Sequence, residues 1–276
     1  MVQYEFGIQT FALGQSVKDD PHAAFGRLAD LGYSCIETAG LHGHSATNLA
    51  FAAREAGMRI DAMHVQPQLQ LDPADHRMTD EVGPIIDDLL TIGASRVVMP
   101  LCLIPEDKMP SRQGNFGQEL RKVVLSLGQD VWHRSAEFLN LKGQQFTDAG
   151  IKLYYHNHDF EFADYDGKSG WNILWDETDN ELVQFEIDLG WVIMGGRDPI
   201  EELRRGAGRI GMIHAKNTYH IKPLVPGEKR ANWEEILRVA KETGVDRFFI
   251  EVEGPFATNA WDATARAFDD LDIAVN

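Results

Sequence analysis

Short apolar segments alternate with amphipathic segments along the whole chain. The apolar segments have the length and two-residue alternation of β-strands, and the intervening segments place apolar residues three and four positions apart, as helices do. Glycine stands just before several of the strands, as expected after a helix end. The pattern predicts strands at 5–11, 34–39, 59–65, 96–101, 151–162, 183–191, 209–217 and 246–254. It predicts helices at 22–32, 46–57, 79–93, 198–206 and 232–244, with a long one within 117–149.

Eight strands in about 250 residues, each followed by a helix, are typical of a (β/α)8 barrel. The structural rival is a doubly wound open sheet, which usually carries a glycine-rich phosphate turn after its first strand. Here that turn reads GIQTFALGQ and contains no G-x-G-x-x-G motif. No linker rich in glycine, serine or proline divides the chain. We therefore expect an α/β protein with a single (β/α)8 TIM barrel, forming one domain over residues 1–276.

The last four predicted strands begin apolar and end polar, most clearly in IKLYYHNHDFEF at 151–162. Residues two apart in a strand share a face. The alternate positions are apolar and suit packing against helices, whereas the polar face gathers charge that a buried strand tolerates only with partners. Because active sites of these barrels lie at the carboxyl ends of the strands, the pattern indicates one shared site. Its face pairs are His156 with His158, Glu186 with Asp188, His214 with Lys216, and Glu251 with Glu253.

These strand ends contain residue types that bind divalent metals. The candidate ligands are His156 or His158, Asp188, His214 and Glu251. Consecutive strands would place them on one side of the barrel mouth. A mixed set of imidazole and carboxylate ligands suits Mn²⁺, Co²⁺, Zn²⁺ or Fe²⁺. Because oxygen ligands are present, Mg²⁺ is a further candidate.

Composition narrows the classes of partner. The formal net charge is −17, from 26 basic and 43 acidic residues, so the chain offers no basic surface for nucleic acid. No segment approaches the roughly 20 apolar residues of a membrane span. Only Cys35 and Cys102 are present, both in apolar contexts, so we interpret them as core residues of a protein from a reducing compartment. The expected location is the cytoplasm.

The sequence resembles the xylose isomerase-like TIM barrel superfamily, the sugar phosphate isomerase/epimerase group related to ketose 3-epimerases and inosose dehydratases. The resemblance covers nearly the whole chain. It rests on GIQTF, GYSCIETAG, YHNHDFEF, EIDLGWVIMGGRDP, GRIGMIHAKN and FFIEVEG taken together.

The resemblance implies one divalent metal ion, with Mn²⁺ the first candidate, held by Glu, Asp, His and Glu from strands five to eight. Asp188, His214 and Glu251 match the last three, and His156 stands where glutamate is usual. We therefore rank His156 above His158 as the ligand. In the epimerases the two metal-bound glutamates exchange protons on opposite faces of the substrate, so this histidine weakens a symmetric two-carboxylate mechanism.

The DNA-repair branch of the superfamily fits poorly. Its trinuclear zinc site needs Asp-x-x-His on strand six and Asp-x-His after strand seven. This chain has Asp188-Leu-Gly-Trp191 at the first position, and no aspartate in the loop 217–231. Together with the acidic charge, this argues against a nuclease.

Other polar or aromatic strand ends are candidates for substrate contact. Each has a structural alternative: Glu37 could form an ion pair, His64 could be a core histidine, and Lys216 could pair with Glu253. The loops 103–116 and 217–231 are long and are candidate lids, with plain surface loops as the alternative. The expected substrate-binding residues are Gln9, Phe11, Glu37, His64, Trp191 and Glu253.

The resemblance implies a sugar or polyol substrate whose adjacent carbonyl and hydroxyl oxygens are chelated by the metal, which acidifies the neighbouring C–H. The candidate catalytic residues are Glu251 as general base, with His158 or Lys216 handling the second proton. The first interpretation is an isomerase or epimerase. The alternatives are a metal-dependent lyase or dehydratase acting on an inosose or 3-keto-glycoside and, less favoured, a non-catalytic sugar-binding barrel. Assembly into a homo-oligomer is a further expectation.

Overall fold

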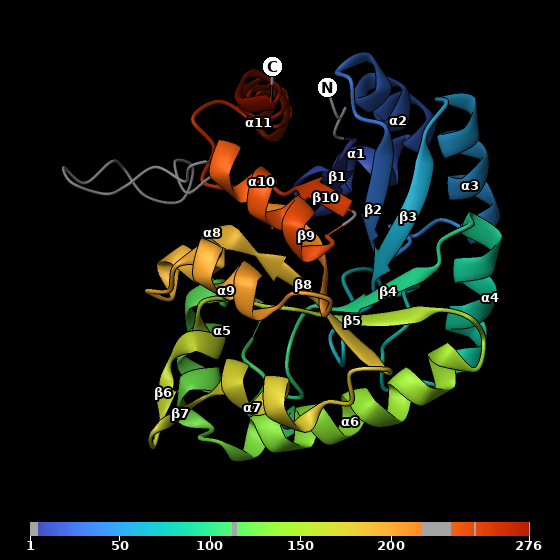
Figure 1. Ribbon diagram of the computed structural model, residues 1–276. Helices are drawn as coiled ribbons and strands as arrows, with labels where there is room; N and C mark the ends of the chain where they lie inside the picture. The colour runs from blue at the N-terminus through green and yellow to red at the C-terminus, as the bar shows by residue number, and fades with distance from the viewer. Residues whose placement is uncertain (1–4, 112–114, 217–232, 246, 276) are drawn as a thin grey trace.

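The computed structural model describes residues 5–111, 115–216, 233–245 and 247–275. In these ranges eight parallel strands close into a barrel in the order β1-β10-β9-β8-β5-β4-β3-β2 (Figure 1). The expectation of a single (β/α)8 barrel is confirmed. The barrel strands are β1 (Phe6–Gln9), β2 (Cys35–Ala39), β3 (Arg59–His64), β4 (Arg96–Met99), β5 (Lys152–His156), β8 (Val183–Asp188), β9 (Ile210–Ala215) and β10 (Arg247–Ile250).

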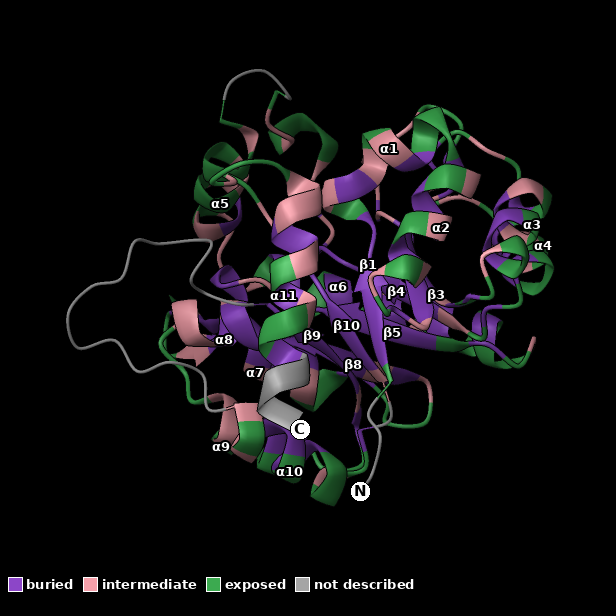
Figure 2. Ribbon diagram, turned by 90° about the horizontal axis from the view of Figure 1, so that it is seen from above, coloured by how far each residue is buried: buried purple, intermediate pink, exposed green. Residues whose placement is uncertain are grey.

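Helices surround the strands, with buried faces toward the barrel and exposed faces outward (Figure 2). Several begin at residues suited to that position: Asp20 caps α2 through its side chain and Asp198 caps α9, each followed by proline. The α-helices are α1 (Gly14–Asp19), α2 (Pro21–Asp30), α3 (Ala46–Glu55), α4 (Val82–Ile92), α5 (Phe116–Ser126), α6 (Asp130–Thr147), α7 (Gly170–Glu177), α8 (Leu189–Met194), α9 (Pro199–Arg205), α10 (Trp233–Thr243) and α11 (Ala260–Val275).

The long helix expected within 117–149 is α6, and a second helix, α5, precedes it. Gly128 separates them with a φ of +68°, a left-handed conformation that glycine adopts without a steric penalty and that no helix continues through. After β5 the chain adds a 3₁₀ turn, η3 (Phe160–Phe162), and a small hairpin, β6 (Asp164–Tyr165) with β7 (Lys168–Ser169), that the sequence pattern did not predict. The other 3₁₀ turns are η1 (Phe11–Leu13) and η2 (Glu106–Lys108).

The barrel interior is filled in two layers. The lower layer is apolar and consists of Cys35, Ala62, Val98, Tyr154, Met212 and Phe249. Residues two positions further along several of these strands form the polar layer described below, since successive inward positions climb toward the carboxyl ends. Both cysteines are buried and free, as expected.

Gly7 on β1 leaves the space that Phe249 occupies in the lower layer. A Cβ at Gly7 would lie 2.4 Å from Cδ1 of Phe249 and 2.7 Å from Sγ of Cys35. We expect Gly7→Ala to lower the free energy of unfolding by about 1–3 kcal/mol through overpacking. Gly26→Ala, in α2 with no atom within 4 Å of the added Cβ, is the matched control and should be neutral or stabilising. Urea denaturation of both variants checks this, and equal effects would contradict it.

Candidate functional site

A cavity of about 760 Å³ opens at the carboxyl ends of the barrel strands. Its size lies in the range of sites for small molecules. Gln66, Pro100 and Leu101 contribute to its wall, as do Phe116, Gly117 and Leu120 of α5. Among its lining residues are Gln9, Phe11, His64, His156, His158, Trp191, Glu251 and Glu253, so eight residues singled out from the sequence meet around one cavity.

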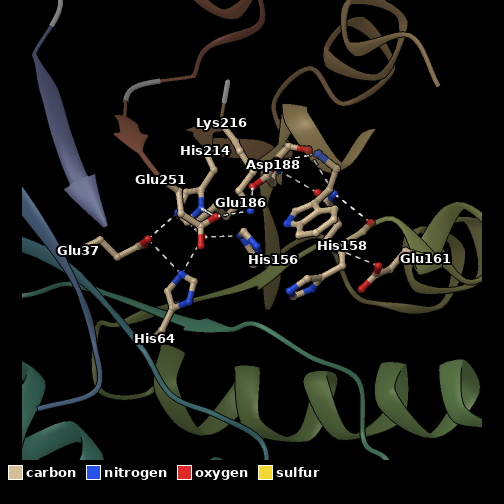
Figure 3. Close-up of polar contacts among 12 residues, drawn as sticks. Glu37, His64, His156, His158, Glu161, Glu186, Asp188, His214, Lys216 and Glu251 are labelled. Carbon is tan, nitrogen blue, oxygen red and sulfur yellow. Dashed lines mark hydrogen bonds and ion pairs between the residues drawn. The ribbon is translucent and has the colours of Figure 1, made fainter. Parts of the chain in front are cut away.

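The four predicted metal ligands come together beside this cavity (Figure 3). One ligand atom from each of His156, Asp188, His214 and Glu251 lies within 4.8 Å of every other, and all four residues are buried. We call these four residues the outer set. Two imidazoles and two carboxylates fit a divalent transition metal or Mn²⁺. The residues present therefore fit the metal that the resemblance implies.

Asp188 is held rigidly where β8 passes into α8. Its Oδ1 accepts a hydrogen bond from the backbone N–H of Trp191 at 2.8 Å, which caps the helix. The side chain of Asn157 bonds to the backbone of Asp188 on both sides, at 3.0 Å and 3.3 Å. The strand end is thus tied to the neighbouring strand β5, and the Asp188 carboxylate has a defined direction.

Lys216 lies between the carboxylates of the outer set. Its Nζ is 2.9 Å from Oε2 of Glu251, 3.1 Å from Oδ2 of Asp188 and 3.5 Å from Oε1 of Glu253. It also lies 4.3 Å from the centre of the Trp191 ring. Burial alone would lower the pKa of this ammonium, but the three carboxylates raise it above its usual value. Lys216 is therefore a fixed positive charge, and the pairing with Glu253 foreseen from the sequence is the longest of its three.

Glu251 follows β10 directly, lines the cavity and belongs to the outer set. Burial alone would raise the pKa of its carboxyl, but the positive charge of Lys216 and the hydrogen bond from His214 hold it well below the usual range. Nδ1 of His214 lies 3.2 Å from Oε2 of Glu251. Glu251 is thus an ionised carboxylate at the cavity, as a general base must be.

His158 follows the end of β5 and lines the same cavity as Glu251. Its ring stacks on Phe160 with centroids 5.1 Å apart and lies 5.4 Å from the Trp191 ring. Burial, together with the nearby positive charge of Lys216 and the His156 ring, lowers its pKa well below the usual value. A neutral imidazole at this position can accept a proton or donate one.

Glu161 positions the loop that carries His158. Its Oε2 accepts the backbone N–H of His158 at 2.8 Å, and its Oε1 accepts the hydroxyl of Tyr155 at 2.7 Å. Asp159 pairs with Arg121 of α5, with 2.7 Å between Oδ2 and Nε. Asp159 and Glu161 therefore support this loop through its backbone and through α5.

Glu161 should also make stability depend on pH. Burial raises its pKa from 4.5 to about 8. The folded state then binds more protons than the unfolded state between these values, so this contribution to stability is full below 4.5 and is lost as the pH rises toward 8. We expect Glu161→Gln to flatten the decline of the melting temperature between about pH 5 and pH 8. Thermal melts across that range check this, and an unchanged slope would contradict it.

Glu186 is the buried residue whose role the sequence did not reveal. Strand parity placed it on the face of Asp188, but gave it no function. Its Oε2 lies 3.0 Å from Nε2 of His64, 3.1 Å from Nε2 of His214 and 3.2 Å from Nδ1 of His156. One carboxylate oxygen therefore meets three histidines from three strands.

Five of the six predicted substrate-binding residues line the cavity, and Glu37 is not among its lining residues. Gln9, Phe11, His64, Trp191 and Glu253 line the cavity. Glu37 is fully buried, and its Oε2 contacts Nε2 of His64 at 3.0 Å and Nε2 of His214 at 2.5 Å. The ion-pair alternative foreseen for Glu37 therefore describes its contacts, and its role as a sugar ligand stays a prediction.

The two candidate lids can be compared with the structure only in part. From the first loop, Asn115 and Phe116 line the cavity. The second, 217–231, lies outside the described residues. Among the helices in the described ranges, none has the length and apolar character needed to cross a bilayer.

Solved structures of similar fold include proteins named as sugar isomerases and epimerases, and also one named as an AP endonuclease. A crystal structure described as a sugar phosphate isomerase/epimerase from Parabacteroides distasonis superposes with a TM-score of 0.75 at 23% identity, covering 98% of each chain. A structure of L-ribulose 3-epimerase superposes with a TM-score of 0.65 at 16% identity, covering 99% of this chain and 96% of that one. At these identities the likeness concerns the fold.

Curated relatives by sequence include inosose dehydratases. The enzyme from Clostridium botulinum is 30% identical over 189 residues, which cover 60% of this chain and 60% of the enzyme. The enzyme from Clostridium perfringens is 31% identical over 131 residues, 48% of this chain and 41% of the enzyme. The chain thus spans about two fifths to three fifths of the length of these relatives.

The fold, the ligand-rich strand ends and these relatives agree with one family profile. The profile described as xylose isomerase-like TIM barrel matches residues 25–271, which include every barrel strand except β1. The chain belongs to the xylose isomerase-like TIM barrel family.

Proposed function

We propose that this protein is a divalent-metal-dependent sugar or polyol isomerase or epimerase that removes a proton from the carbon next to a carbonyl. The observation that carries the proposal is the position of the Glu251 carboxylate, which lines the cavity and is one of the four residues of the outer set. The protein's relatives are enzymes of carbohydrate conversion by name. Substrate, reaction and metal are parts of this proposal.

Each residue of the site has a role in the proposed reaction. His156, Asp188, His214 and Glu251 would hold the metal, with Mn²⁺ as the first candidate, and the metal would polarise adjacent carbonyl and hydroxyl oxygens of the substrate. Glu251 takes the proton from the C–H bond. The Lys216 ammonium, fixed by its ion pairs, places positive charge where the enediolate oxygen develops.

The second proton-transfer group is the neutral His158. It lines the same cavity as Glu251. His158 follows β5 and Glu251 follows β10, the first and the last of the four strands with polar ends. An imidazole held neutral by its surroundings can return a proton to the substrate once it has received one. Trp191 and Phe11 supply apolar surface for the face of a sugar ring, and Gln9, His64 and Glu253 supply polar contacts.

A lyase is the second candidate, and His156 favours it. A symmetric epimerase uses two carboxylates, whereas here the imidazole of His156 stands at the end of β5, where one of those carboxylates is usual. In such a reaction Glu251 would take the C–H proton, His158 would give its ring proton to the leaving hydroxyl, and His158 would regain a proton as Glu251 loses its own through solvent. Curated relatives named inosose dehydratase add weight to this outcome. An inosose or a 3-keto-glycoside is the substrate class to test.

The test is proton exchange in deuterated water. The Mn²⁺-loaded protein is incubated with ketoses, inososes and 3-keto-glycosides, and the products are followed by NMR and mass spectrometry. An isomerase or epimerase gives a sugar whose mass changes only by the incorporated deuterium. A dehydratase gives a product that has lost one molecule of water. Absence of both deuterium incorporation and product with every substrate would overturn the enzyme proposal in favour of a sugar-binding barrel.

A further inference from the structure

Four buried side chains form a closed ring of contacts in the barrel interior, next to the outer set, with which the ring shares His214. They are His64, His214, Glu37 and Glu186, and we call them the inner tetrad (Figure 3). Each histidine Nε2 touches both carboxylates: His64 at 3.0 Å and 3.0 Å, His214 at 2.5 Å and 3.1 Å. Nitrogen and oxygen therefore alternate around the ring.

The inner tetrad consists of two Glu–His pairs, and the same backbone arrangement produces each pair. Glu37 on β2 pairs in register with Ala62 on β3, two residues before His64. Glu186 on β8 pairs with Met212 on β9, two residues before His214. Each pair of strands contains a register shift directly before its glutamate, and β-bulges of this kind re-aim side chains.

The two strand pairs lie half a barrel apart. In the closed order, β4 and β5 separate them on one side, and β1 and β10 on the other. The rings of His64 and His214 accordingly stack almost parallel, with 6° between their planes and centroids 5.5 Å apart. The barrel thus brings two Glu–His pairs face to face around a common centre.

The distances around the ring are close to those of a metal site. Ligands bound tetrahedrally at about 2.0–2.1 Å from a metal are about 3.3 Å apart. The four nitrogen–oxygen distances are 2.5–3.1 Å, slightly shorter than the distance between two ligands of one metal ion. Oε1 of Glu37 and Oε1 of Glu186 are buried and have no hydrogen-bond partner among the described residues, which leaves further donor atoms free.

From this geometry we propose that the inner tetrad is a second divalent-cation position, for a Zn²⁺- or Co²⁺-like ion. His64, Glu186 and His214, with His156 beside them, also form a group whose ligand atoms lie within 4.8 Å of one another. His64 and His156 line the cavity and provide the entrance. The donor set of imidazole and carboxylate suits these ions.

The inner and outer positions are alternatives because they share His214. A cation in the inner tetrad binds Nε2 of His214, and the ring proton then sits on Nδ1 and is donated to Glu251 at 3.2 Å. A cation in the outer set uses Nδ1, and Nε2–H is donated to the inner carboxylates. Lys216 already places positive charge between the outer carboxylates, whereas the described residues place no lysine or arginine against the inner ones.

Binding in the inner tetrad balances without any other reactant. Two Nε2 protons, one on each histidine, can serve the four contacts when no cation is present. With both rings in the imidazolium form at the start, the cation replaces the two Nε2 protons, which pass to solvent, and each ring keeps its Nδ1 proton, so the net charge of the cluster is unchanged. This exchange removes the need for each Nε2–H to be shared between two carboxylates.

The experiment separates the two positions with Asp188→Asn, which disables the outer set and retains a side chain able to cap α8. The chelator-stripped protein is reloaded with Co²⁺, its metal content is measured, and crystals are examined for anomalous scattering at the cobalt edge. We expect Asp188→Asn to keep a bound cobalt, with its peak between Glu37 and Glu186. Adding Glu186→Gln or, separately, His64→Gln should weaken this binding by more than the roughly 10–100-fold that loss of a supporting group costs.

Two results would overturn the second cation position. One is an Asp188→Asn protein that binds no cobalt; the other is a cobalt peak confined to His156 and Glu251. Crystals of the single Asp188→Asn variant give this readout by themselves should the double variants fold poorly. The inference stands apart from the proposed reaction, because failure of deuterium exchange would leave the cobalt position unaffected.

Discussion

Glu251→Gln is expected to lower kcat/KM by about 10³-fold or more, since the substitution removes the proposed general base and a proposed metal ligand together. The amide is nearly the same size as the carboxylate, so the packing after β10 should be retained. Its carbonyl oxygen cannot take up a proton at neutral pH, and it carries no charge to pair with Lys216, now 2.9 Å from Oε2.

Steady-state kinetics on the substrate identified by deuterium exchange measure this loss. The matched control is Glu181→Gln, the same change at an exposed position before β8, which should leave the rate within experimental error. Circular dichroism verifies that both variants fold. A Glu251→Gln enzyme that keeps more than a tenth of the activity would exclude Glu251 as the base.

Lys216→Met is expected to destabilise the metal-free protein by about 3–5 kcal/mol, because it leaves buried Asp188 and Glu251 without their positive partner. Methionine keeps most of the apolar length that packs against Trp191, so the effect isolates the charge. A divalent cation in the outer set would neutralise the same carboxylates. Excess Mn²⁺ should therefore restore much of the lost stability.

Urea denaturation with a chelator and with Mn²⁺ tests both halves of this expectation. Lys122→Met is the matched control: its ammonium lies 2.7 Å from Glu119 on the exposed face of α5, where an ion pair contributes about 0–1 kcal/mol. Equal losses with and without Mn²⁺ would mean that the outer carboxylates do not bind the cation. A loss no larger than that of Lys122→Met would mean that Lys216 does not stabilise the buried carboxylates.

The periodicity of the chain was sufficient to predict the barrel and the inward direction of its polar residues. His156, Asp188, His214 and Glu251 meet at 4.8 Å or less because each stands at or next to the carboxyl end of one of four consecutive barrel strands. The long helix predicted within 117–149 is α6, and the pattern did not distinguish the shorter α5, which ends before Gly128. That residue was visible in the sequence, but a single glycine does not by itself end a helical pattern.

The contacts across the barrel were not predictable in the same way. His64 and Glu186 are 122 positions apart, and Glu37 and His214 are 177 apart. Their meeting depends on closure of the strands and on the two register shifts beside the glutamates. The pattern also did not show that Lys216 would pair with Asp188 and Glu251 ahead of Glu253.

The sequence by itself determined the (β/α)8 fold, the family and the set of side chains that face the barrel mouth, because these follow from local periodicity and motif. Only the tertiary structure decided which of those side chains touch. Charges buried in a barrel are satisfied by partners on strands distant in sequence, and distances of a few ångströms between them depend on barrel closure, strand register and bulges. For that reason Glu186, which has no distinguishing local signal, emerged as the residue that links three histidines.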